Sequence, residues 1–206
     1  MEDVRDLKEL QIDALREVAN IGAGHAATAL SQMTNRRIMI SVPQINIARL
    51  EEVAELLGDP QAVVVAVLMH MLGDLTGRTL LLFPEKVGQR LCDMLLRRAH
   101  GATTGFDTLE QSALKEAGNI LSGAYMNALS DFMGMLLLPS VPSLVIDLPS
   151  AVLTSAAVNL GTERDYVFCV ETQFMFVAEE ETLRGYFLLV PDFASLRAIL
   201  QAVRLT

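Results

Sequence analysis

The stretch Asp13-Ala14-Leu15-Arg16-Glu17-Val18-Ala19-Asn20-Ile21 returns later in the chain as Ser112-Ala113-Leu114-Lys115-Glu116-Ala117-Gly118-Asn119-Ile120. The offset is 99 residues without a gap, and it continues to Pro43 and Pro142. Between residues 13–47 and 112–146, 13 of 35 aligned pairs are identical, whereas composition alone would give about two or three. The chain of 206 residues is therefore an internally duplicated unit.

Each copy repeats one polar spacing within a helical pattern. An Asp or Ser is followed by Glu after three residues, by Asn after two more, and by Pro after a further 22. At about 100° per residue, the first three positions fall within roughly 60° of one another on a helix. Asp13, Glu17 and Asn20 are therefore expected on one exposed face, and Ser112, Glu116 and Asn119 on another.

A structural explanation of this pattern competes with a functional one. A Glu and an Asn on a helix are usually solvated surface residues, and Pro43 and Pro142 could simply end or bend a strand. The duplication favours function, because exposed positions of a duplicated sequence drift fastest. Here the exposed Glu and Asn match, while Val18 and Ala117, at an apolar position, do not.

Hydrophobic periodicity and turn residues predict helix, strand, short helix, hairpin and helix in each half. In the first half we expect helices over 5–33, 51–58 and 84–98, and strands over 38–50, 63–71 and 79–83. In the second half we expect helices over 107–133 and 149–160 and from 191, and strands over 136–148, 166–177 and 185–190. The predicted fold class is α/β (α+β), with a mixed β-sheet and a pseudo-twofold axis.

The duplication also predicts the domain organisation. We expect a single domain over residues 1–206, made of repeats at about 1–100 and 107–206 that share one core. The Gly/Thr-rich linker 101–106 joins them. Gly22-Ala23-Gly24 should allow close packing against Ser122-Gly123-Ala124, which would offset the low helix propensity of glycine; the alternative is a weak, kinked helix.

Composition excludes several classes of function. The net charge of −9 argues against nucleic acid and against an anionic membrane surface as partners. The acidic N-terminus carries no signal-peptide pattern, and the longest apolar run, 62–72, contains His70 and is too short to span a bilayer, so we expect a cytoplasmic protein. Cys92 and Cys169 should be buried thiols, and the three histidines show no metal-ligand spacing, so no metal or cofactor of its own is expected.

The doubled pattern, with Asn-Ile in both copies, resembles the CheC family of chemotaxis phosphatases, whose relatives include CheX and FliY proteins. The resemblance spans the chain and implies a CheC-like fold with the two long helices side by side on one face. It also implies an aspartyl-phosphate phosphatase (a hydrolase) that acts on the phosphorylated response regulator CheY. Glu17, Asn20, Glu116 and Asn119 would be catalytic, and Asp13, Ser112, Pro43 and Pro142 would support them.

The residue chemistry fits an incomplete active site. The sequence shows no Ser-His-Asp or Cys-His arrangement, and Asn cannot act as a general base. An Asn amide can donate and accept hydrogen bonds at once, which suits it to holding a water molecule. Phosphoryl transfer mainly needs positioning and charge stabilisation. The resemblance implies that CheY supplies the aspartyl phosphate, Mg²⁺ and a lysine that pairs with Glu17 or Glu116.

A second partner is implied by the family, the receptor deamidase CheD. The segment 147–160 is the candidate surface, with Asp147 as its candidate residue, although Ala151-Val152-Leu153 is equally explained as core. The alternative function is a non-catalytic interaction module that binds CheD, CheY or the flagellar switch. The end of the chain at Thr206 argues against a FliY-type switch protein. We expect a monomer; a homodimer formed through the polar faces is the competing possibility.

Overall fold

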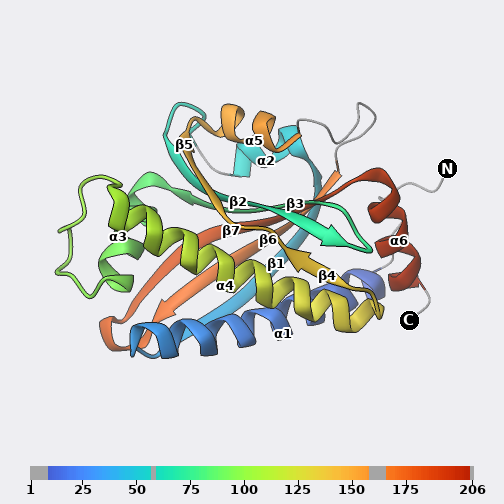
Figure 1. Ribbon diagram of the computed structural model, residues 1–206, viewed down its shortest axis with the longest axis horizontal. Coiled ribbons are helices and arrows are strands. Elements are labelled where there is room, and N and C mark those ends of the chain that lie inside the picture. The colour runs from blue at the N-terminus through green and yellow to red at the C-terminus, as the bar shows by residue number, and fades with distance from the viewer. Residues whose placement is uncertain (1–8, 57–58, 158–165, 205–206) are drawn as a thin grey trace.

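The computed structural model describes residues 9–56, 59–157 and 166–204, and its elements follow the duplicated order (Figure 1). The first half contains α1 (Glu9–Thr34), β1 (Ile38–Arg49), α2 (Leu50–Leu56), β2 (Val64–Gly73), β3 (Gly77–Pro84) and α3 (Glu85–Leu95). The second half contains α4 (Thr108–Met133), β4 (Leu137–Pro139), β5 (Ser143–Asp147), α5 (Pro149–Ala157), β6 (Tyr166–Phe176), a 3-10 turn (Val177–Glu179), β7 (Glu181–Pro191) and α6 (Phe193–Arg204). The expected helical residues 5–8, 57–58 and 158–160 lie outside the described residues.

The strands form one sheet in which the two halves exchange their first strands. The order is β1-β6-β7-β3-β2-β4, and β5 also pairs with β2. Strand β1 of the first half therefore lies beside the hairpin β6–β7 of the second half, while β4 and β5 of the second half lie beside the hairpin β2–β3 of the first. The hairpins meet along β3 and β7, where Leu80 lies opposite Leu188.

The α/β class, the duplication and the two long helices on one face agree with the prediction. The strand pairing in the sheet does not. We expected mixed pairing, but every strand pair in the described part of the chain is antiparallel. The pseudo-twofold arrangement accounts for this. It sets β3 against its counterpart β7 in opposite directions, and each exchanged first strand runs against the hairpin strand that it borders.

Helices cover both faces of the sheet and enclose a separate core on each side. Figure 1 shows α1 and α4 on one face and α2 and α5 on the other. Alternate side chains of the central strands enter the two cores: Val65 and Leu81 face α1 and α4, whereas Val64 and Leu80 face α2 and α5. This explains the uninterrupted apolar run of β2, because a strand covered on both faces needs no polar side.

The two motif prolines lie where the exchanged strands are interrupted. In β1 the register against β6 shifts between Ser41 and Gln44, which brackets Pro43. The single strand expected over 136–148 is instead two, β4 and β5, with Pro142 in the break. Ser140 closes the break by pairing with His70 through its backbone N–H and its hydroxyl, whereas proline has no N–H to donate.

The two long helices run side by side in opposite directions and touch at a glycine (Figure 1). A Cβ at Gly22 would lie 2.7 Å from Cδ1 and 2.9 Å from Cα of Tyr125 in α4. The ring of Tyr125 in turn stacks on Phe187 of the sheet, with 4.5 Å between ring centroids. The close packing predicted for Gly22-Ala23-Gly24 against Ser122-Gly123-Ala124 is therefore present at Gly22, with Ala124 and Tyr125 as its partners, and absent at Gly24 and Gly123.

This contact predicts opposite effects for two glycines on the same helix. Gly22→Ala should lower the free energy of unfolding by about 1–3 kcal/mol, because the new methyl group meets backbone that cannot yield. Gly24→Ala, where a Cβ would meet nothing within 4 Å, should raise it by up to about 1 kcal/mol. Urea unfolding measures both values, and a stable Gly22→Ala variant would contradict the close contact.

Candidate active site

The polar residues of the repeated motif lie on the outer faces of α1 and α4. Asp13, Glu17 and Asn20 are exposed on α1. On α4, Ser112 and Glu116 are exposed and Asn119 is half-buried. Each triplet therefore occupies one helix face, and the structure places the two triplets on neighbouring helices of the same layer (Figure 1).

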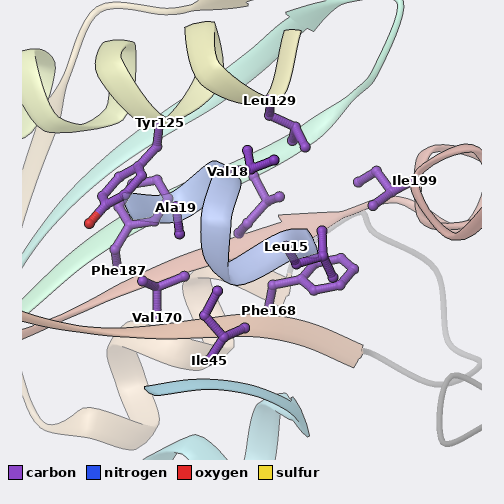
Figure 2. Close-up of a pocket in the computed structure, with 11 residues that line it drawn as sticks. Leu15, Val18, Ala19, Ile45, Tyr125, Leu129, Phe168, Val170, Phe187 and Ile199 are labelled. Atoms are coloured by element: carbon purple, nitrogen blue, oxygen red, sulfur yellow. The ribbon is translucent and has the colours of Figure 1, made fainter. Parts of the chain in front are cut away.

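An apolar underside holds α1 in this orientation. Figure 2 shows Leu15, Val18 and Ala19 turned toward the sheet, over a cavity of about 50 Å³. The remaining walls come from β1, α4, β6, β7 and α6: Ile45, Tyr125, Leu129, Phe168, Val170, Phe187, Leu189 and Ile199. The only polar atom among these side chains, the Tyr125 hydroxyl, hydrogen-bonds Thr172 at 3.3 Å. The apolar contacts around the cavity therefore hold the helix in place, and the cavity presents no catalytic group.

A basic residue accompanies the motif in both copies. Arg16 pairs with Asp13 on the same helix, with 2.5 Å between Nη1 and Oδ1, and Lys115 holds the equivalent position in α4. Both partners of the first pair are substantially exposed, so it adds little to stability. The pair places a guanidinium beside the carboxylate of Asp13.

The other predicted residues lie away from the helix faces. Pro43 lies in β1, and its side chain is outside the described part of the structure. Pro142 is half-buried in the break before β5. Asp147 is exposed at the end of β5, where it leads into α5 on the opposite side of the sheet from α1 and α4.

A polar groove of about 480 Å³ with charged walls lies between α3, the linker and β7. Its ionised groups bond within the protein. Arg90 donates to both carboxylate oxygens of Glu181, at 2.9 and 2.8 Å from Nε. Asp93 accepts the backbone N–H groups of Gly101 and Thr103, each at 2.8 Å. Burial alone would raise the pKa of Asp93, but these hydrogen bonds and Arg90 lower it, so the carboxylate anchors the linker in its ionised form.

Other kinds of active site find no support in the described residues. Both cysteines are buried, and burial raises the pKa of the Cys92 and Cys169 thiols to about 12, so neither provides a reactive thiolate at neutral pH. Residues 9–56, 59–157 and 166–204 hold no group of three His, Cys, Asp or Glu side chains suited to a metal ion. Within the same ranges, every helix is too short or too polar to cross a membrane.

Two further features of the helix faces were noted in the sequence but were not assigned a role in the site. Ile21, beside Asn20, is 47% exposed, and Ile120 is half-buried at the equivalent position. Gly24 and Gly123 follow one turn later. Both repeat at the 99-residue offset, and they were not counted among the site residues because isoleucine and glycine carry no chemical function of their own.

Comparison with known proteins places this arrangement in a family. The model of the CheC-like family matches residues 10–47 and 109–146, two stretches that begin and end 99 residues apart. The CheY-P phosphatase CheC of Bacillus subtilis is 32% identical over 199 residues, which cover 96% of this chain and 95% of that protein. The chain belongs to the CheC-like family. The matched stretches of this CheC-like protein contain both Glu–Asn faces and both prolines.

The other relatives include proteins of the flagellar motor. The flagellar motor switch phosphatase FliY of Bacillus subtilis is 26% identical over 129 residues, 62% of this chain and 33% of that protein. The crystal structure of Thermotoga maritima FliY superposes with a TM-score of 0.78 at 21% identity, covering 97% of this chain and 98% of that one. At that identity the superposition shows a shared fold.

Proposed function

We propose that this CheC-like protein dephosphorylates the phosphorylated response regulator CheY. The observation that carries the proposal is the Glu–Asn pair that recurs at a fixed offset on two neighbouring helices, exposed on α1 and with Asn119 half-buried on α4. Its relatives in Bacillus subtilis include a CheY-P phosphatase that matches this chain over almost its full length. Because its substrate is CheY, the protein would act in the cytoplasm, where CheY is found. Both faces lie on one chain, so a monomer is sufficient for the activity.

The proposed reaction is attack of a water molecule on the phosphorus of the aspartyl phosphate. The bond between phosphorus and the aspartyl oxygen breaks, which releases inorganic phosphate and the free carboxylate, and the proton of the water leaves with the phosphate. Asn20 or Asn119 holds the water in line by accepting one hydrogen bond from it and donating another from the amide N–H. CheY would bring Mg²⁺ and a lysine, which would supply the positive charge that stabilises the phosphoryl group.

The remaining motif residues position the partner. Glu17 or Glu116 pairs with the lysine of CheY and thereby fixes how the response regulator docks. Asp13, held by Arg16, and Ser112 adjust the rim of each face. Pro43 and Pro142 shape the exchanged strands that follow the helices, which is supported by the register shift in β1 and the break before β5.

Removal of the two asparagines tests the catalytic role. Loss of phosphate from phosphorylated CheY with Mg²⁺ is measured for the wild type, Asn20→Ala, Asn119→Ala and the double variant. We expect the double variant to lose at least about a hundredfold in rate, because the water is no longer positioned, while each single variant keeps the activity of one face.

Gln32→Ala, an exposed change near the end of α1, serves as the control and should leave the rate unchanged. A double variant as fast as the wild type would reject the catalytic role of the asparagines. A wild type that binds CheY without accelerating phosphate loss would favour the alternative, a non-catalytic interaction module.

We also propose that CheD binds at the segment from Asp147 into α5. Val152 and Leu153 are buried in the core beneath α5, so they are core residues and the surface available to a partner consists of Asp147, Ser150, Ala151 and Thr154. Asp147→Ala should weaken CheD binding at least tenfold in a calorimetric titration, whereas Asp131→Ala, an exposed acidic residue of α4, should not. If Asp147→Ala binds CheD as tightly as Asp131→Ala does, the CheD-binding surface lies elsewhere on the protein.

A further inference from the structure

Four glycines lie inside the two long helices, and the structure explains only two of them. Gly22 is needed for the approach of Tyr125, and a Cβ at Gly118 would lie 2.5 Å from Cγ1 of Val67. At Gly24 and Gly123 a Cβ would meet nothing within 4 Å. Neither of these two has a positive φ, so the helical backbone accepts any residue there.

Glycine at these two positions destabilises the helices, and no contact with the described residues 9–56, 59–157 and 166–204 compensates for it. Alanine would favour the helix at both places, and no neighbouring atom would oppose it. The glycines are nevertheless identical in the two copies, at the 99-residue offset, although the next aligned pair, His25 and Ala124, differs. We therefore attribute the requirement for glycine to a binding partner that contacts the helix surface at these positions.

The two glycines continue the proposed catalytic faces. Gly24 lies four residues after Asn20, and Gly123 four residues after Asn119, which places each glycine one turn further along the same helix face. The isoleucine beside each asparagine adds an apolar contact: Ile21 is 47% exposed, and Ile120 is half-buried. Each helix thus presents, in order, a carboxylate, an amide, an apolar side chain and an open glycine.

We infer that Gly24 and Gly123 are positioning residues that admit the backbone of phosphorylated CheY, next to its phosphoaspartate, against α1 and α4. At a glycine position the helix has no Cβ atom, so another backbone can approach more closely there than at any other residue. With that contact made, the phosphoryl group reaches the water held by the asparagine one turn away. The identity of the occupant rests on the proposed function, and its place follows from continuity with the Glu–Asn faces.

The test isolates one face at a time. In the Asn119→Ala background only the face on α1 remains active, and Gly24→Ala and Gly24→Gln are introduced there. Three quantities are measured: KM and kcat for phosphorylated CheY, affinity for CheY activated with beryllofluoride, and the temperature of thermal unfolding. Asn20→Ala with changes at Gly123 gives the mirror experiment on α4.

We expect Gly24→Ala to raise KM about tenfold, and Gly24→Gln to lower kcat/KM by about a hundredfold, because a displacement of about 1 Å already disrupts catalysis. The affinity of the α1 face for beryllofluoride-activated CheY, measured with Gly123→Gln also present to block the α4 face, should fall in parallel. The unfolding temperature of Gly24→Ala should stay equal or rise, so stability and function move in opposite directions. Gln32→Ala, which also favours helix, is the matched control and should leave KM unchanged.

Several outcomes would overturn the inference. Wild-type KM and affinity in Gly24→Gln would show that nothing approaches the glycine. If light scattering shows a dimer for the wild type and a monomer for Gly24→Gln, the partner at this glycine is a second copy of the chain. If the wild type does not bind beryllofluoride-activated CheY, the inference fails as well. If it binds with glycine-dependent affinity but does not hydrolyse the phosphate, the proposed function fails and the docking role of glycine stands.

Discussion

The structure depends on the exchange of first strands between its two halves. Strand β1 pairs only with the hairpin of the second half, and β4 and β5 pair only with the hairpin of the first, within the described residues. Neither half therefore completes its own sheet. Because α1 leads into β1 and α4 leads into β4 after three residues each, the exchange also fixes where the two helices lie: side by side, antiparallel, over the same face.

This arrangement turns helix faces into a rigid platform. The undersides of α1 and α4 enter the larger core, where Gly22 meets Tyr125 and Tyr125 meets Phe187. Because these contacts fix the rotation of each helix about its axis, the Glu and Asn residues lie on the outer faces of α1 and α4. The proposed site can then remain chemically incomplete, since its task is to hold one water molecule and one partner in a defined geometry while the partner provides the phosphate, the metal and the cation.

Sequence periodicity predicted the local elements well and their neighbours poorly. The hairpin β2–β3, both long helices and the outward polar faces follow from residue spacing, because each depends on contacts close in the chain. The strand exchange does not, since an apolar alternation shows that a segment is a strand but not which strand lies beside it. The break at Ser140–Pro142 was also missed: a proline allows a bend or an interruption, and the choice depends on how Ser140 bonds to His70 of β2.

The catalytic role of the asparagines depends on the position of one water molecule when CheY is bound. A crystal structure of the complex with beryllofluoride-activated CheY measures that position most directly. We expect the amide of Asn20 or Asn119 within hydrogen-bond distance, about 3 Å, of a water in line with the beryllium. We also expect Glu17 or Glu116 on a lysine of CheY, and CheY backbone over Gly24 or Gly123. A complex in which both asparagine amides point away from the beryllium would contradict the catalytic role.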